Sequence, residues 1–178
     1  IVSDAGMPSI CDPGEELVKQ VKFNGFNIIC VPGPCAAITA LVSSGMPSSR
    51  FVFIGFLPKK KIDREKILFG ISESEKTTII FESPHRLKRL LKELYELCGG
   101  EREIEVAREL TKKFEEHIGN NINNVISFFE NREVIGEITI VLKGVHKQQK
   151  YEFNTLLLKK DLSELIKAGL SLSGASKY

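Results

Sequence analysis

Two short loops rich in glycine, proline and small polar residues are the first places where a ligand could bind. The loop SDAGMPS begins at Ser3, after the apolar pair Ile1 and Val2, and the loop PGPCAA follows the apolar run FNIICV. Glycines let backbone amides approach a ligand closely, and Cys35 and Ala36 are small enough to leave room at a helix start. Tight turns use the same residue types, so the pattern alone leaves both interpretations open.

Two further segments gather acidic and basic side chains at the ends of predicted strands. In FESPHR, Glu82 ends the apolar run TTIIFE, and Arg86 lies in the first turn of the following helix. In ARELTK, Glu109 and Lys112 come directly after the run EIEVA. A structural interpretation competes with a functional one, because Glu82 could pair with Arg108 across neighbouring strands.

The elements that must position these segments form two α/β patterns. A strand ending at Val2, a helix after Gly14, a strand FNIICV and a helix from Cys35 to about Gly45 give a parallel arrangement. The two glycine loops then leave the carboxyl ends of adjacent parallel strands, where small ligands bind in open α/β sheets. The second pattern comprises an aromatic strand FVFIGF, the strand TTIIFE, a helix from Pro84 to Cys98, the strand EIEVAREL, a short helix around NVISFFE and the strand GEITIVLKG.

A shift in composition near Ser48 predicts a domain boundary. We therefore expect part of a first α/β domain over 1–48, a complete second α/β domain with a mixed sheet over 49–147, and a short helical tail over 148–178. The tail has helical periodicity and then a second helix start at Ser173, as a helix-turn-helix would.

Composition and charge exclude several classes of protein. The 178 residues are 42% hydrophobic and 27% charged, as in a soluble globular protein, and no apolar run approaches the roughly 18 residues of a membrane span. The net charge of +2 does not by itself indicate nucleic-acid binding. The segments GxxxxGK[ST] and GxGxxG, which bind nucleotides, are both missing from the sequence.

The cysteines and histidines do not predict a metal site. The four cysteines lack CxxC spacing and a nearby histidine, so we expect reduced thiols, no metal and a cytoplasmic protein. His117 and His146 stand without partners in the sequence, and we expect no catalytic role for either.

Six segments in order, SDAGMPSICDPG, VPGPCAAITAL, GFLPKKK, FESPHRL, ARELTK and GEITIVLKG, resemble the tetrapyrrole methylase superfamily. Within it they are most similar to the bacterial enzymes that methylate the 2′-oxygen of a cytidine in 16S rRNA. The resemblance implies two α/β domains, S-adenosylmethionine bound between them, a homodimer, and 16S rRNA or the small ribosomal subunit as partner. Family members begin with a first strand and a PTPIGNLxD-type loop, so we expect this chain to be a fragment lacking that part.

The resemblance also implies roles for individual residues. The expected cofactor contacts are Asp4, Ala5, Gly6, Ser9, Cys35, Ala36, Glu82 and Leu110. A ribose hydroxyl gains from a positioned base, and the candidates for that base are Glu82, Glu109 and a deprotonated Lys112. The expected RNA contacts are Lys59, Lys60, Lys61, Arg64, Arg86, Arg89 and Arg108.

Two other functions stay open at this point. One is methylation of a tetrapyrrole-type small molecule, against which the lysine-rich stretch LPKKKIDREK argues, because a small substrate does not need it. The other is that the isolated chain is an inactive fragment of its parent enzyme, since half of the first domain would be missing.

Overall fold

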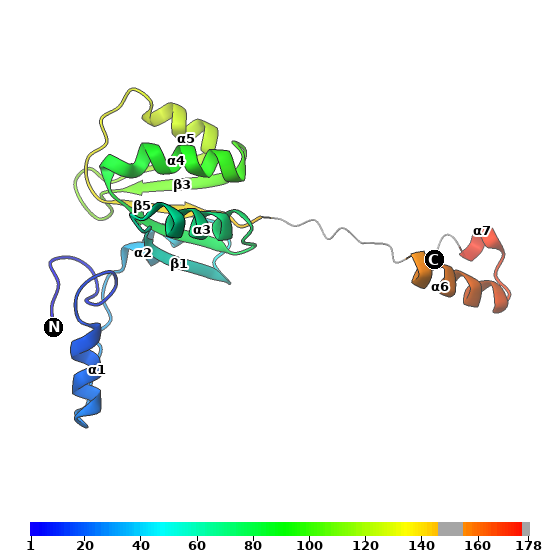
Figure 1. Cartoon of the computed structure of the whole chain (residues 1–178), viewed down its shortest axis with the longest axis horizontal. Helices are drawn as coiled ribbons and strands as arrows, with labels where there is room; N and C mark the ends of the chain where they lie inside the picture. Colours follow the sequence, from blue (N-terminus) through cyan, green and yellow to red (C-terminus); the bar gives the residue numbers. More distant parts are fainter. Residues whose placement is uncertain (146–154, 176–178) are drawn as a thin grey trace. The chain divides into compact units, whose positions relative to one another are not determined.

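The centre of the molecule is a mixed β-sheet. The computed structural model describes residues 1–145 and 155–175, and within them five strands lie in the order β1-β2-β5-β3-β4 (Figure 1). β1 and β2 are parallel, and every other neighbouring pair is antiparallel. This mixed sheet confirms the α/β class. The strands are β1 (Phe51–Phe56), β2 (Thr77–Glu82), β3 (Glu103–Arg108), β4 (Glu116–Asn121) and β5 (Ile138–Leu142).

Helices cover both faces of this sheet. The larger core lies between the sheet and three helices, and the smaller core lies under α2 on the opposite face. Alternate residues of a strand serve the two cores, as Ile80 and Ile79 of β2 show. The helices of this part of the chain are α1 (Glu15–Phe23), α2 (Ala36–Ser44), α3 (Lys61–Ser72), α4 (Pro84–Cys98) and α5 (Ile122–Phe129).

α4 forms where the sequence predicts it, with the same bounds. Pro84 occupies its first turn, where a missing N–H costs nothing, and the leucine stripe is buried against the sheet. The buried residues of this stripe are Leu87, Leu90, Leu91 and Leu94. α4 therefore fixes the one-residue connection at Ser83, which directly follows Glu82 at the end of β2.

Two predicted strands do not form. The segment FNIICV has no strand assignment, and Phe26, Ile29 and Val31 are exposed. Ile1 and Val2 are likewise exposed and outside the sheet. A strand needs a hydrogen-bonded neighbour, and neither segment pairs with another strand among the described residues.

Two elements were absent from the sequence prediction. The basic stretch after β1 continues into α3, which buries Arg64, Leu68 and Ile71 on one face. β4, with the sequence EHIGNN, is a polar outer strand that buries only Ile118. Neither has the apolar periodicity on which the prediction relied.

The chain divides into two compact units, residues 1–146 and 147–178. The second unit contains α6 (Thr155–Lys167) and α7 (Leu172–Ala175), in line with the helices expected in the tail. His146 lies outside the described residues, and the division of the first unit at residue 48 stays a prediction. No helix in the described part of the chain is long and apolar enough to cross a membrane.

His117 holds β3, β4 and their connecting segment together. Its Nδ1 lies 3.0 Å from a carboxylate oxygen of Glu105 on β3, and its Nε2 lies 2.9 Å from one of Glu115. The other oxygen of Glu115 accepts a hydrogen bond from the backbone N–H of Thr111 at 2.7 Å. The hydrogen bonds to Glu115 and then to Glu105 raise the pKa of His117 above its ordinary value.

We expect a glycine-to-alanine change at Gly55 to destabilise the protein by about 1–2 kcal/mol, the cost of a left-handed conformation for a residue with a Cβ. Gly55 has a φ of 69° next to a bulge in β1, and a Cβ there would lie 2.6 Å from Cys11 Sγ. Gly70→Ala is the control, because a Cβ at this position in α3 meets nothing within 4 Å. Denaturant unfolding should show a loss for Gly55→Ala and none for Gly70→Ala; equal stabilities would contradict the expectation.

The histidine contacts predict a pH dependence of stability. Because the pKa of His117 is raised in the folded state, its contribution is present below the unfolded pKa of roughly 6.5 and is lost as pH rises through the higher folded value. Thermal unfolding of the wild type should thus lose more stability above about pH 6.5 than that of His117→Gln. Parallel pH curves for the two proteins would show that the histidine makes no such contribution.

Candidate functional site

The sheet topology brings four polar chain segments to the edge of the sheet at which the carboxyl ends of β1, β2 and β3 lie. β1 and β2 run in the same direction, and β3 shares it because both β2 and β3 are antiparallel to β5. The carboxyl ends of β1, β2 and β3 therefore meet where β5 begins, and Ile138 is the register partner of both Glu82 and Arg108. Glu82 and Arg108 are thus separated by β5, and the pairing between them that the sequence left open does not form.

A pocket with a volume of about 440 Å³ lies at this edge. One side comes from the N-terminal loop and the start of α2, and the other side comes from the strand ends. The lining residues of the first side are Ala5, Gly6, Met7, Ile10, Cys11, Asp12, Pro34, Cys35, Ala36 and Thr39. Those of the second side are Phe56, Phe81, Glu82, Ser83, Pro84, Leu110, Thr111, Lys112, Gly136, Glu137, Ile138 and Thr139.

The two glycine-rich loops of the sequence meet in this pocket. Gly6 has a φ of 74°, and a Cβ on it would lie 3.4 Å from the carbonyl oxygen of Pro34. A glycine here thus allows both the backbone conformation and the close approach of the two loops. Both loops line the pocket, although the strands expected before them do not form.

An ion-paired group forms another part of the wall. Lys112 Nζ lies 2.9 Å from Glu109 Oε1 and 3.1 Å from Glu137 Oε2. Glu109 also accepts the backbone N–H of Glu137 at 2.8 Å, while its own N–H donates to the carbonyl of Glu137 at 2.9 Å. These contacts hold the start of the β3–β4 connection against the segment that leads into β5.

The charge state of this group bears on which residue could act as a base. The hydrogen bonds to Glu109 and then to Glu137 raise the pKa of Lys112, so the predicted deprotonated amine is disfavoured. The hydrogen bond from the Glu137 backbone, followed by that from Lys112, lowers the pKa of Glu109. Glu109 is therefore a weaker base than an ordinary glutamate, because its hydrogen bonds stabilise the charged carboxylate. Lys112 fits the role of a fixed cation better than that of a base.

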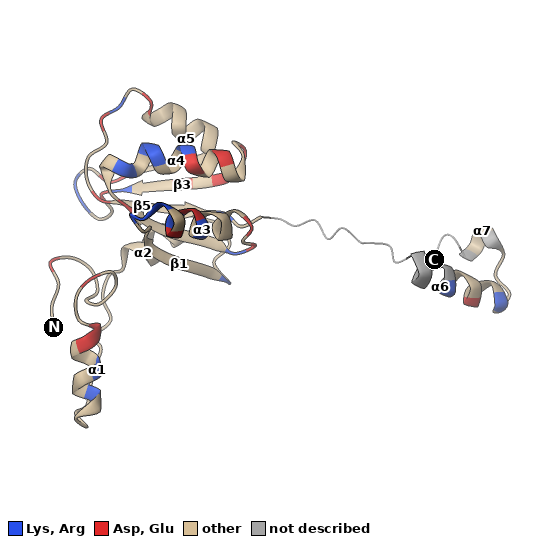
Figure 2. Ribbon diagram, viewed as in Figure 1, with Lys and Arg blue, Asp and Glu red and all other residues tan. Residues whose placement is uncertain are grey.

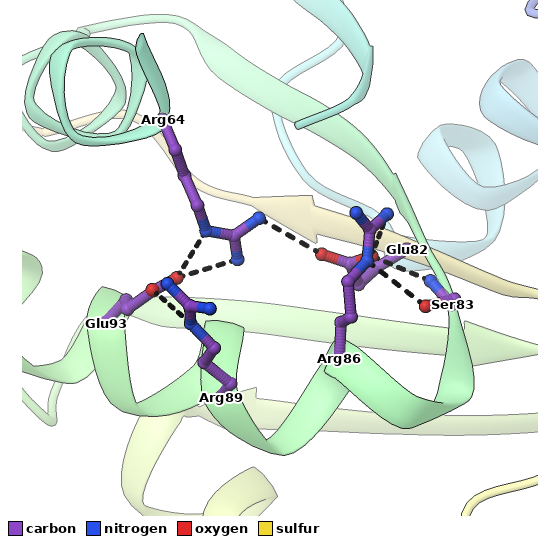
Figure 3. A network of polar contacts seen from close by, with 6 residues as sticks. All are labelled: Arg64, Glu82, Ser83, Arg86, Arg89 and Glu93. Carbon is purple, nitrogen blue, oxygen red and sulfur yellow. Dashed lines mark hydrogen bonds and ion pairs between the residues drawn. The ribbon is translucent and has the colours of Figure 1, made fainter. Parts of the chain in front are cut away.

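Glu82 lies in a buried network between β2, α3 and α4 (Figure 3). Its side chain has no solvent exposure, Oε1 lies 2.6 Å from Arg86 Nη2, and Oε2 lies 3.6 Å from Arg64 Nη1. Arg64 in turn donates from Nε and Nη2 to Glu93 at 2.9 and 2.7 Å. Burial acts to raise the pKa of Glu93, but the hydrogen bonds from Arg64 and Arg89 outweigh it and leave the pKa lowered.

The structure brings most of the predicted cofactor residues together. Asp4 and Ser9 do not line the pocket. The Ser9 side chain instead occupies the space next to Gly14 that a Cβ on this glycine would need. The predicted residues that do line it are Ala5, Gly6, Cys35, Ala36, Glu82 and Leu110. Among the candidate bases, Glu82 and Lys112 line the pocket, and Glu109 contacts two residues that do.

Not every predicted RNA contact is available at the surface. Arg64 is 3% exposed and has carboxylates on both sides, so it cannot meet a phosphate, and this prediction is wrong. Arg108 pairs with Glu116 at 3.0 Å and Arg86 with Glu82. The exposed members of the set are Lys59, Lys60, Lys61 and Arg89.

Sequence reasoning missed the part of the pocket contributed by residues 136–139 and by the aromatic side chains of β1 and β2. The signal available was a glycine, Gly136, two residues before β5; in the structure it has a φ of 94°, and a Cβ there would lie 2.5 Å from Glu109 Cγ. Phe56 and Phe81 end parallel neighbours and pack with ring centroids 5.8 Å apart. No group of histidine, cysteine or acidic residues in the described ranges is arranged to hold a metal.

Similar proteins were found by sequence. Two are named Ribosomal RNA small subunit methyltransferase I: the protein from Synechocystis sp. is 39% identical over 177 residues and that from Bacillus subtilis 39% identical over 181. Each match covers 99% of this chain but only 63% and 62% of the respective relative. The chain therefore spans about three fifths of the length of these relatives.

Solved structures share the fold. The methyltransferase CobJ gives a TM-score of 0.60 at 20% identity, with 79% of this chain and 62% of that chain covered. The uroporphyrin-III C-methyl transferase from Thermus thermophilus, complexed with S-adenyl homocysteine, gives 0.51 at 16% identity, covering 76% and 62%.

Residues 1–125 match the sequence pattern of the family described as Tetrapyrrole (Corrin/Porphyrin) Methylases, and this match decides the family. This stretch contains five of the six segments on which the resemblance was based, and it ends within α5. The chain belongs to the tetrapyrrole methylase family.

Proposed function

We propose that the protein is an S-adenosylmethionine-dependent methyltransferase that modifies the 2′-oxygen of a cytidine in 16S rRNA. The observation that carries the proposal is a pocket formed by the two glycine loops and the strand ends, in a chain 39% identical to relatives named as rRNA methyltransferases. A related fold binds S-adenyl homocysteine, the product that such a cofactor leaves behind.

The pocket has the features that a cofactor of this size needs. Its volume of about 440 Å³ is within the range of sites for small organic ligands. Small residues at the start of α2, Cys35 and Ala36, leave space beside the loop at Gly6. The backbone amides of these loops would orient the ligand, and Leu110 and Phe81 would contact its apolar parts. Bound there, S-adenosylmethionine would supply an electrophilic methyl group.

The chain's own contribution to methyl transfer is mainly alignment. An in-line displacement requires the acceptor oxygen, methyl carbon and sulfur to be held in a row, and a rigid wall serves this purpose. Lys112, held by Glu109 and Glu137, gives the wall a fixed positive charge near the acceptor side. Of the predicted bases, Glu109 stays a candidate for accepting a proton from the ribose hydroxyl, as a weak base that adjoins the pocket through its contacts with Lys112 and Glu137.

The RNA would lie over the basic surface next to the pocket. Phe56 lines the pocket, and the exposed Lys59, Lys60 and Lys61 follow it directly in the chain. In α4 the basic residues gather toward the helix start, near the pocket, and the acidic ones toward its end (Figure 2). Arg89 is the most accessible arginine of this set. A phosphate backbone fits this arrangement better than a compact tetrapyrrole does.

The remaining expectations belong to the same proposal. The 1–48 and 49–147 segments would be the two domains between which the cofactor binds, and the protein would act as a cytoplasmic homodimer on the small ribosomal subunit. A metal is not required by this chemistry, because the sulfonium itself activates the methyl group.

Filling the pocket should weaken cofactor binding. In Ala36→Phe an added ring would occupy space where α2 lines the pocket, so the affinity for S-adenosylmethionine should fall at least about tenfold, a loss of roughly 1.4 kcal/mol. Val42→Phe is the matched control, because Val42 lies on the same helix, is 72% exposed and does not line the pocket.

Calorimetric titration of the protein in its full natural length measures this difference. Equal affinities in the two variants would place the cofactor elsewhere. No binding by the wild type would contradict the methyltransferase proposal as a whole.

Removing lysines beside the pocket should weaken RNA binding without affecting the cofactor. Lys60→Ala/Lys61→Ala removes two exposed cations whose contacts with Asp63 and Glu65 are loose, at 3.7 and 3.8 Å. If each contacts a phosphate, the slope of log K against log salt should fall by about 2 for this pair. Binding to 16S rRNA fragments, followed over a series of salt concentrations, gives the slope.

The control pair is Lys19→Ala/Lys22→Ala, which removes the same charge from α1. An equal slope change in both double variants would mean that the effect is one of net charge and not of this surface.

A further inference from the structure

Glu82 is the one buried acidic residue among those that the structure describes. It ends β2, and its Oε1 accepts the backbone N–H of Ser83 at 2.8 Å and faces Arg86 at 2.6 Å. Its Oε2 has no hydrogen-bond partner in the described residues, and Arg64 faces it at 3.6 Å. Glu82 is one of the residues that line the pocket, but its side chain is 0% exposed, so a substrate hydroxyl has no access to either carboxylate oxygen.

The surroundings of Glu82 form a continuous chain of alternating charge (Figure 3). Arg64 comes from α3, and its side chain is 4% exposed between Glu82 and Glu93. Glu93, the second partner of Arg64, also pairs with the exposed Arg89 at 2.8 Å. Burying such charges costs free energy, and well-packed apolar residues often stabilise a fold as well or better. A contribution to stability alone is therefore a weak explanation for this network.

The connection from β2 to α4 shows what the network holds in place. A single residue, Ser83, separates the strand from the helix, and its side chain makes no capping hydrogen bond. The N–H of Ser83 is instead satisfied by Glu82, while its hydroxyl accepts from Arg86 Nε at 3.2 Å. The carbonyl of Ser83 accepts the first N–H groups of the helix, from Arg86 and Leu87. The shape of this turn therefore depends on Glu82 and its arginine partners.

We propose that Glu82 and Arg64 are positioning residues, which fix the turn at Ser83 and Pro84 as part of the pocket wall, and that Glu82 is not the general base. The inference rests on the proposed function, because the pocket is taken to be the cofactor site. Arg64 acts from behind Glu82, and Arg86 ties the same carboxylate to the first turn of α4. The wall segment Phe81 to Pro84 lines the pocket along its whole length.

The test compares two isosteric substitutions in the same network. Glu82→Gln keeps the shape of the side chain but removes the charge that faces Arg64 and Arg86. Glu93→Gln removes an equal charge that also faces Arg64, from a residue that does not line the pocket. We expect cofactor affinity to fall at least about tenfold in Glu82→Gln and to change less than about twofold in Glu93→Gln. Arg64→Met should weaken the cofactor affinity in the same direction as Glu82→Gln, and the two changes together should cost less than their sum.

Kinetics on small ribosomal subunits separates positioning from base catalysis. A lost general base lowers kcat by about 10²–10⁴ and removes a limb of the pH profile while leaving cofactor affinity intact. A lost positioning residue raises the KM for the cofactor and keeps the pH profile of the wild type. The first result would overturn the inference, and so would wild-type affinity in Glu82→Gln.

A readout without any ligand keeps the inference distinguishable from the proposed function. Hydrogen exchange of the backbone amides from Ser83 to Leu87 should accelerate at least about tenfold in Glu82→Gln and stay unchanged in Glu93→Gln. Unchanged exchange in both variants would overturn the positioning role. If the exchange differs as expected but the wild type binds no S-adenosylmethionine, the turn is held as inferred and the assignment of the pocket is what fails.

Discussion

The position of β5 between two strands that run the opposite way determines where the chemistry can lie. Because β2 and β3 both pair with β5 antiparallel, their carboxyl ends meet at one edge, and the segment leading into β5 starts there. β1 and β2 supply an aromatic wall from Phe56 and Phe81, the loop after β3 supplies the charged Lys112, and the segment leading into β5 supplies Gly136 and Glu137. The apolar core stays behind this edge, where every residue of β5 is buried. The sheet can therefore carry a polar site without disturbing its own packing.

Strong apolar periodicity is what made parts of this fold predictable. The helix Pro84–Cys98 and the strand TTIIFE follow from a leucine stripe and from a run of β-branched and aromatic residues, which tertiary contacts reinforce. The strand expected at FNIICV has a more apolar sequence than TTIIFE, yet it is exposed and unpaired in the described structure. β4 shows the opposite case, because its pairing with β3 decides its conformation and its residues EHIGNN do not. Apolar character predicts a strand only where a partner edge is available.

Local sequence placed the site's loops but not the partners of its charges. The two loops were singled out by their glycines and small residues, and the family resemblance then named Ala5, Gly6, Cys35 and Ala36 within them as cofactor contacts. One partner of Glu82, Arg86, lies four residues away, but the other, Arg64, comes from a sequence-distant helix, and the sequence suggested only Arg108 as a possible distant partner. A signal for Arg64 existed: together with Leu68 and Ile71 it occupies positions i, i+4 and i+7 of one helix face, and all three are buried.

Contacts within the protein hold the loop after β3 in shape. Glu109 and Thr111 have φ values of 53° and 65°, a conformation that costs residues with a Cβ about 1–2 kcal/mol each. Hydrogen bonds made within the protein hold them there: Glu109 accepts the backbone N–H of Glu137, and the N–H of Thr111 donates to Glu115, which His117 in turn binds. Because these contacts offset the cost of the strained backbone, the binding energy of a ligand is not needed to offset it. A ligand that enters the pocket therefore meets a wall already ordered on this side, and its affinity is not reduced by the entropy of ordering that loop.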